Sequence, residues 1–215
     1  MRIDPEGRTA QGITTFVLFV VLNVLYLLAC LPVVTIGVAT SALLEVTLRY
    51  ADDERGHLVR GFVVALGRNA WRGTAAFVAL GLPAAMLVYS GVFWLSLTSV
   101  LSAVAGALAL LGACYLLAAL LYALALVGWF DAPLRRTVRN ALLLPLVEPA
   151  RTLLLVLIPV GSACLALVAP QTLFLGATIG FSFGAYVCAF LLHGVFRRRQ
   201  AHPSELEPVS PHSGQ

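Results

Sequence analysis

The chain has 215 residues, of which 60% are hydrophobic and only 11% are charged. A soluble domain usually carries about 25% charged residues, so this composition excludes an ordinary soluble fold. Two stretches, residues 74–130 and 152–196, contain no Asp, Glu, Lys or Arg. Each far exceeds the roughly 20 residues that cross a hydrocarbon core, so each must fold back within the membrane. The sequence predicts an all-α, polytopic transmembrane helical bundle in a single domain, residues 1–199.

All 14 basic residues are arginine, and the formal net charge is +4. Arginines beside apolar spans mark the cytoplasmic boundary of multi-pass proteins, so this balance indicates membrane anchoring and not nucleic-acid binding. The same rule places the loops at 49–72 and 131–151, the arginines at 197–199 and the C-terminus on the cytoplasmic side. The short polar tail, residues 200–215, is predicted to be a disordered cytoplasmic segment.

About six membrane segments are expected, and the second of them is short. The first span covers about 13–31 and ends at Pro32, which removes a backbone donor. A short helix over about 39–50 follows and carries Glu45. If it crosses the membrane there are six spans, and if it does not there are five, which also decides the side of the N-terminus. The later spans are expected at 74–95, 101–129, 152–169 and 172–196.

Two amphipathic helices are expected to lie in the cytoplasmic interface between these spans. In the first, residues 57–72, Arg60, Arg68 and Arg72 fall on one side of a helical wheel. In the second, residues 131–148, three arginines again share a face. This pattern is typical of interfacial helices that turn their arginines toward lipid phosphates. The opposite side of the first helix is apolar and consists of Val59, Phe62, Val63, Leu66 and Ala70.

A candidate parallel repeat relates residues 57–130 to residues 131–199. Each unit holds an amphipathic helix with the same tripeptide, Arg68-Asn69-Ala70 in the first and Arg139-Asn140-Ala141 in the second. Each helix is followed by a hairpin of two spans with the same orientation, as in parallel transporter repeats. The shared layout supports the repeat more than the three shared residues do.

The opening of the chain contains three distinctive strings: Asn23-Val24-Leu25-Tyr26, Cys30-Leu31-Pro32-Val33-Val34-Thr35-Ile36-Gly37 and Ala39-Thr40-Ser41-Ala42-Leu43. They resemble the opening of the YesL-like group of bacterial membrane proteins, whose function is unknown. The resemblance covers residues 13–196, and it departs at Val38, where proline is expected, and at Ala70, where an aromatic residue is expected. It implies a protein of the bacterial cytoplasmic membrane, often encoded near carbohydrate ABC uptake systems, and it implies no established activity.

A candidate intramembrane site combines a helix break with polar side chains. A broken helix at membrane depth exposes backbone groups that bind solutes, although an ordinary turn at the membrane surface is the favoured interpretation. Glu45 would carry a proton if it were buried alone, but an ion pair with Arg49, one turn later, is favoured. Asn23 is expected to hydrogen-bond between helices. The candidate residues are Asn23, Pro32, Thr35, Gly37 and Glu45.

A second candidate site is the basic face of the two amphipathic helices. Anchoring to anionic lipid is the simplest interpretation, and the alternatives are docking of a cytoplasmic subunit or binding of a phosphorylated solute. The adjacent asparagines favour something beyond lipid, because lipid binding needs only charge. This docking or lipid-phosphate face consists of Arg60, Arg68, Asn69, Arg72, Arg135, Arg136, Arg139 and Asn140.

The motifs of the common enzyme classes are missing from the sequence. There is no P-loop, no H-E-x-x-H, no G-x-S-x-G and no pair of carboxylates within a span. The four cysteines lack the spacing of a metal or redox site. We therefore expect no catalytic activity, no cofactor and no bound metal.

The leading hypothesis is a non-enzymatic accessory component of a carbohydrate (ABC-type) uptake system. Its expected partners are membrane lipids and the permease or ATPase subunits of a sugar transporter, and the oligomeric state stays open. The alternative is a small autonomous solute transporter or channel with a broken-helix site at Pro32–Gly37. A polar cavity lined by Asn23, Thr35 and Glu45 would favour the transporter. An apolar bundle with an exposed, arginine-rimmed cytoplasmic groove would favour the accessory role.

Overall fold

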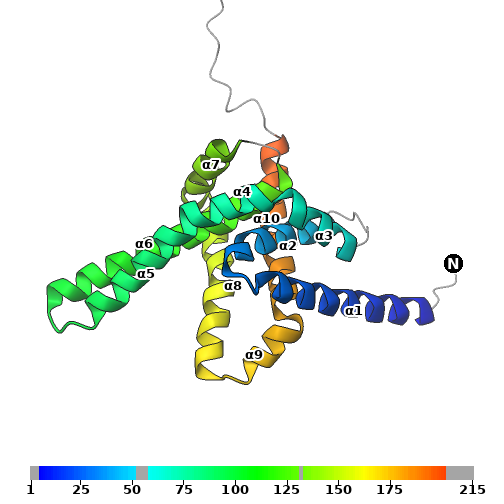
Figure 1. Cartoon of the computed structure of the whole chain (residues 1–215), viewed down its shortest axis with the longest axis horizontal. Helices are drawn as coiled ribbons and strands as arrows, with labels where there is room; N and C mark the ends of the chain where they lie inside the picture. Colours follow the sequence, from blue (N-terminus) through cyan, green and yellow to red (C-terminus); the bar gives the residue numbers. More distant parts are fainter. Residues whose placement is uncertain (1–4, 52–57, 131–132, 202–215) are drawn as a thin grey trace, which may run out of the picture.

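The computed structural model is all-helical, which confirms the predicted fold class (Figure 1). It describes the backbone of residues 5–51, 58–130 and 133–201, and their side chains except those of 5–13, 175 and 193–201. The predicted tail therefore lies, from residue 202, outside the described residues. The elements in chain order are α1 (Pro5–Cys30), the 3-10 turn η1 (Val33–Thr35), α2 (Ile36–Ala51), α3 (Leu58–Arg68), α4 (Ala70–Ala76), the π-helical turn η2 (Phe77–Gly81), α5 (Leu82–Leu95), α6 (Val100–Trp129), α7 (Leu134–Val147), α8 (Pro149–Val168), α9 (Thr172–Leu175), the π-helical turn η3 (Gly176–Gly180) and α10 (Phe181–Ala201).

Among the described residues, five helical runs are long and apolar enough to cross a membrane, so the chain is a multi-pass membrane protein. A shorter apolar run, Thr14–Cys30 of α1, precedes them. The second segment begins earlier than the helix expected over 39–50: α2 starts at Ile36 and has 16 residues, and together with η1 it forms a run of 19 residues. The five runs are Val33–Ala51, Ala70–Leu95, Val100–Trp129, Pro149–Val168 and Thr172–Leu192.

The first amphipathic segment is divided at Asn69, whereas a single helix was expected over 57–72. Asn69 adopts φ −88° and ψ 0° between α3 and α4, and α4 then continues through η2 into α5 as one span. Two residues of the predicted apolar side differ in burial: Phe62 is buried, and Val63 is exposed. Thus α3 packs one side against the protein and is more than a surface helix.

The central helix of the structure is α2. It packs against α1, α3, α4, α6 and α10, and each residue from Ser41 to Leu48 is buried. A glycine permits the closest of these contacts: a Cβ at Gly37 would lie 2.3 Å from Cβ of Phe77 and 2.7 Å from the carbonyl oxygen of Gly73. Small residues let membrane helices approach this closely, and packing then stabilises their association.

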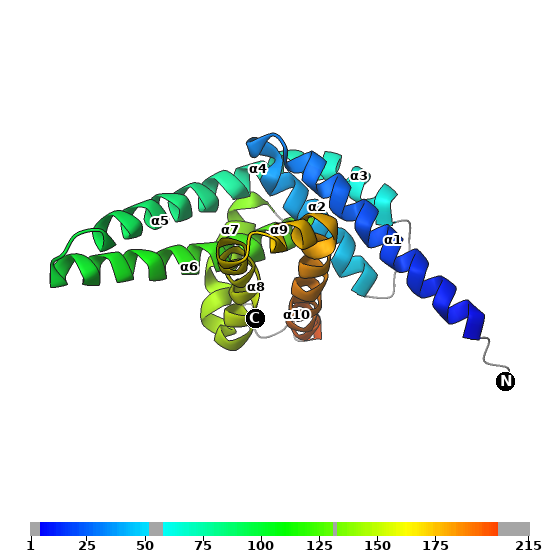
Figure 2. The ribbon, with the colours of Figure 1, turned by 90° about the horizontal axis from the view of Figure 1, so that it is seen from below.

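The α5–α6 hairpin extends away from the rest of the protein (Figures 1 and 2). Its helices touch where Gly91 faces Gly106: a Cβ on either glycine would lie 3.1–3.3 Å from the other's carbonyl oxygen. Most residues from 100 to 111 on α6 are partly or fully exposed, whereas nearly all from 118 to 128 are buried. The outer half of α6 is therefore largely exposed beside its hairpin partner, and the inner half forms part of the core.

The second hairpin consists of α8 and the α9–α10 run, and it points in a different direction from α5–α6 (Figure 1). The chain turns at Pro170-Gln171, as predicted. The two helices differ in their surroundings: α10 packs against α1, α2 and α8, whereas Leu155 is the one buried residue of α8. Consequently α10 joins this hairpin to the core.

Candidate functional site

The centre of the candidate site is the carboxylate of Glu45 on α2, a residue that is 3% exposed. Its Oε1 lies 3.1 Å from Nη2 of Arg49, one turn later on the same helix, and also accepts a hydrogen bond from Nη2 of Arg68 on α3. Its Oε2 accepts a hydrogen bond from Nδ2 of Asn69 at 2.8 Å. The pair with Arg49 is the one expected from sequence spacing, and the other two contacts were not expected.

Close packing of α6 on α2 covers this carboxylate. A Cβ at Gly128 would lie 2.7 Å from Cβ of Glu45, so α6 passes directly over the acidic residue. One turn earlier, Oγ of Ser41 donates to the carbonyl oxygen of Leu124 at 3.0 Å. A carboxylate withdrawn from water needs charge partners and hydrogen-bond donors. The two arginines and the asparagine described above supply both.

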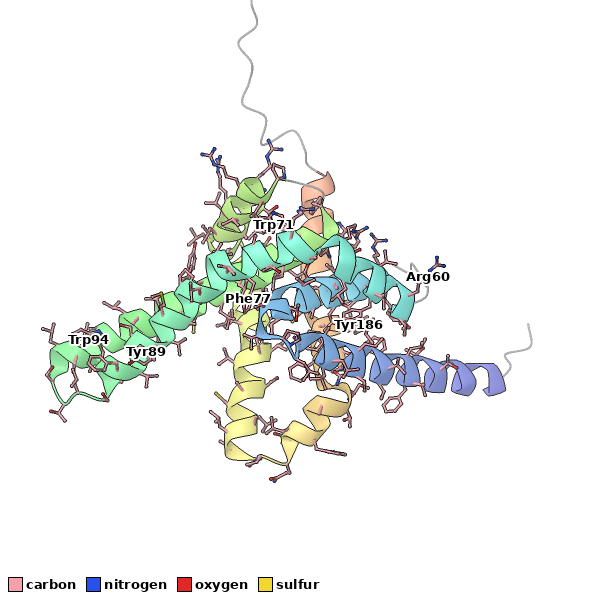
Figure 3. All side chains as sticks on the ribbon, in the orientation of Figure 1. Arg60, Trp71, Phe77, Tyr89, Trp94 and Tyr186 are labelled. Atoms are coloured by element: carbon pink, nitrogen blue, oxygen red, sulfur yellow. The ribbon has the colours of Figure 1, made fainter. Side chains whose placement is uncertain are left out.

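The residues predicted for the basic face of the first amphipathic helix do not share one outward surface. Arg68 and Asn69 bind the buried carboxylate, and Asn69 is 1% exposed. Nη2 of Arg72 donates to the carbonyl oxygen of Phe130 at 2.8 Å. Arg60 is exposed and points away from the protein (Figure 3). Three of the four predicted residues therefore hold α3 and α4 against α2 and the end of α6.

Asn23 on α1 is fully buried and binds the π-helical turn of the last span. Its Nδ2 donates to the carbonyl oxygens of Gly176 at 3.3 Å and Ala177 at 2.5 Å. Its Oδ1 accepts from the backbone N–H of Ser182 at 3.0 Å, with Oγ of the same serine at 3.4 Å. A π-helical turn disturbs the regular helix ladder, and Asn23 supplies partners for the backbone there. This agrees with the interhelical role expected for it.

The break at Pro32–Gly37 is a compact local turn. Oγ1 of Thr35 donates to the carbonyl oxygens of Ala29 and Pro32, both at 2.6 Å, and so satisfies the end of α1. Pro32 itself is exposed, and Gly37 is buried against α4. This geometry matches the ordinary turn that was favoured over a solute site.

The five predicted intramembrane residues therefore occupy four separate environments. Asn23 binds η3, and Thr35 binds its own turn together with Pro32. Gly37 packs against α4, whereas Glu45 binds residues of α2, α3 and the junction of α3 with α4. Among the described side chains, these residues do not converge on a shared polar cluster.

A second charged surface lies on α7. Arg135, Arg136 and Arg139 are exposed, while the opposite side of the helix is buried and packs against α6. Asn140 is half-buried, and within the described ranges it has no hydrogen-bond partner for its side chain. An open groove, called the α7 groove below, runs along one flank of the helix. It is lined by Leu134, Arg135, Val138, Arg139, Leu142 and Leu143.

Two residues of these sites, Gly128 and Ser182, were not predicted from the sequence. Gly128 sits at the end of an apolar span, and nothing in the sequence separates it from the glycines around it. Ser182 lies between two phenylalanines in an apolar span, where one hydroxyl carries no distinct signal. Over the part of the chain that the structure describes, no three His, Cys, Asp or Glu residues gather as a metal site.

Residues 19–91 match the model of a family described as "Protein of unknown function, DUF624". This segment is similar to the DUF624 family. The match covers about a third of the chain, from the middle of α1 to α5, and so includes Glu45 and its three partners. Comparison with the curated proteins and with the solved structures finds no match. The region around Glu45 thus lies in the segment that is similar to DUF624, and this similarity assigns it no activity.

Proposed function

We propose that this multi-pass membrane protein is a non-enzymatic accessory component of a carbohydrate (ABC-type) uptake system in the bacterial cytoplasmic membrane. The carbohydrate assignment rests on the YesL-like resemblance of the opening segment, which is an analogy at family level. The physical support is the α7 groove, because it combines exposed arginines with an apolar floor on the side predicted to be cytoplasmic.

The residues of the α7 groove support one kind of occupant. Arg135 and Arg139 line it together with leucine and valine side chains, so a complementary surface carries carboxylates beside apolar residues. Residues 131–151 contain four arginines against Asp131 and Glu148, and Glu148 lies 3.9 Å from Arg151. The charge of this segment is therefore positive overall. An acidic amphipathic helix on the permease or the ATPase subunit is the partner that fits.

The alternative of an autonomous transporter has less support. It requires a polar cavity that joins Asn23, Thr35 and Glu45, and each of these side chains has its own separate partners. Moreover, the Pro32–Gly37 segment, which the transporter would use as a broken helix, satisfies its backbone through Thr35. The accessory role needs only an exposed docking surface.

The proposal is tested by site-specific crosslinking in the native host. A photoreactive residue at Val138 or Leu142, both in the α7 groove, is expected to capture a permease or ATPase subunit of a sugar uptake system. The double variant Arg135→Glu/Arg139→Glu should lose this capture, because its carboxylates would repel an acidic partner. Arg60→Glu, an exposed position on α3, is the matched control and should keep it.

Two results would overturn the accessory role. One is capture of no uptake subunit at either position. The other is equal capture by wild type and the α7 double variant. In either case, solute flux into proteoliposomes, measured for wild type and Glu45→Gln, becomes the test of the transporter alternative.

A further inference from the structure

Two arginines of the segment that is similar to DUF624 share a single carboxylate oxygen. Nη2 of Arg49 lies 3.1 Å from Oε1 of Glu45, and Nη2 of Arg68 donates to the same oxygen. The second oxygen, Oε2, accepts from Asn69. Since both guanidinium groups converge on one atom, they lie side by side, although they come from different helices, α2 and α3.

Among the described residues, the charges of this cluster do not balance. Two guanidinium groups against one carboxylate leave a formal charge of +1. The side chains of Arg49 and Arg68 are 47% and 46% exposed, whereas that of Glu45 is 4% exposed. The carboxylate therefore neutralises the arginines from the inner side only. Neighbouring like charges repel each other, so an anion on the outer side would stabilise the arrangement.

We propose that Arg49 and Arg68, oriented by Glu45, bind a phosphate group. A guanidinium group presents its N–H donors in a planar fork that matches two phosphate oxygens, and a tetrahedral phosphate has enough oxygens to engage two such forks. Glu45 fixes both arginines before the ligand arrives, which lowers the entropy lost on binding. This site is independent of the α7 groove and of the proposed accessory role.

The position of the pair selects phosphates near the membrane surface. Arg49 lies in the last turn of α2, two residues before the helix ends at Ala51, and α3 carries Arg68 in its own last turn. The headgroup of an anionic phospholipid and a phosphorylated solute both present a phosphate at this boundary. They share the recognition chemistry and differ in whether the phosphate is held in a bilayer.

The acidic run Asp52-Asp53-Glu54 follows α2 in the sequence and lies outside the described residues. Its charge therefore has to be controlled in the test. The triple variant Asp52→Asn/Asp53→Asn/Glu54→Gln removes these carboxylates and leaves the two arginines in place. If phosphate binds this variant and not the wild type, the chain's own carboxylates occupy the arginines, and the proposal is overturned for the native protein.

The experiment uses the full chain with two probes. The first is inorganic phosphate added to protein in a neutral detergent, with binding followed by calorimetry. The second is nanodiscs of phosphatidylcholine with or without phosphatidylglycerol, with retained lipid measured by native mass spectrometry. Arg49→Gln and Arg68→Gln are expected to weaken binding about tenfold or more, as for loss of a charge-assisted bidentate contact. Arg60→Gln, an exposed arginine of α3, should change it by less than about twofold.

A folding control keeps the test decisive. Arg49→Lys and Arg68→Lys preserve the charge next to Glu45 but lose the planar fork, so they should fold and still bind more weakly than wild type. Binding of inorganic phosphate identifies a soluble phosphorylated ligand, and selective retention of phosphatidylglycerol alone identifies a lipid headgroup. Binding of neither probe, or equal loss in Arg60→Gln, would overturn the proposal.

Discussion

The tripeptides Arg68-Asn69-Ala70 and Arg139-Asn140-Ala141 are identical in sequence and lie in different environments. The first pair of polar side chains binds Glu45, and Asn69 is buried. In the second, Arg139 is exposed, Asn140 is half-buried, and neither binds a carboxylate within the described residues. The difference comes from α2, which brings a buried acidic residue to the first tripeptide.

The contrast shows that a basic amphipathic helix has no fixed role. Arg68 at the end of α3 and Asn69 just after it bind Glu45 and so hold α3 to the core. The arginines of α7, in contrast, are exposed at the surface. The candidate repeat of residues 57–130 and 131–199 stays a prediction. If the repeat is real, the proposed partner subunit would pack against α7 in the way that α2 packs against α3.

Removing the carboxylate should have the largest effect. Glu45→Ala leaves the half-exposed Arg49 and Arg68 side by side without their shared partner and the buried Asn69 amide without its acceptor. We expect a loss of about 2–3 kcal/mol, as for hydrogen bonds to a buried charged group. Glu148→Ala is the control, because Glu148 lies 3.9 Å from Arg151 and is partly exposed, and it should cost less than about 1 kcal/mol. Denaturation of the purified protein in detergent measures both. Equal losses would show that the buried site is no stronger than a surface pair.

Opening the contact that covers the carboxylate should have the next largest effect. Gly128→Ala places a Cβ 2.7 Å from Cβ of Glu45, and the resulting separation of α2 from α6 should cost about 1–3 kcal/mol. Gly161→Ala on α8 meets no atom within 4 Å and should be neutral or stabilising by up to about 1 kcal/mol, since alanine favours a helix. The melting temperatures of the two variants test this expectation. Similar shifts would mean that α6 does not pack closely against Glu45.

The two asparagines provide the most direct test of the contrast between the tripeptides. Asn69→Ala leaves Oε2 of Glu45 without its donor, and we expect a loss of about 1–2 kcal/mol. Asn140→Ala should change stability by less than about 0.5 kcal/mol, as at other partly exposed positions. The same denaturation assay compares them. A larger loss of stability for Asn140→Ala would show that the second tripeptide, and not the first, holds its helix in place.

The smallest effect on stability is expected for charge reversal on α7. Arg139→Glu changes an exposed residue that has no ion pair among the described residues, so unfolding should shift by less than about 0.5 kcal/mol. Its effect should appear instead in capture of a partner, as described above. A destabilisation above about 1 kcal/mol would show that Arg139 holds α7 in place and is not free for docking.

Composition was sufficient to predict the helical, multi-pass fold, because uncharged runs of this length have few other structures in a membrane. The Glu45–Arg49 pair was also readable, since residues four apart on a helix face each other. The contacts of Arg68 and Asn69 with Glu45 could not be predicted, because they depend on how α3 packs against α2. Hydropathy gives little help there, since lipid and protein interior accept apolar side chains equally well. The second helix starts three residues earlier than expected, because Gly37 was assigned to the end of a break, whereas it lies inside the helix and permits close packing.

The bonds between Asn23 and the last span impose an order on biosynthesis. The carbonyl oxygens and the serine that Asn23 binds lie 153 to 159 residues further along the chain. At a synthesis rate of about 5–20 residues per second, roughly 8–30 s pass between emergence of this amide and emergence of its partners. During that interval α1 enters the membrane with a polar group that only the end of the chain can satisfy. Ribosome stalling or truncation before residue 176 would thus leave an incomplete protein that quality-control proteases in the membrane can distinguish from the finished one.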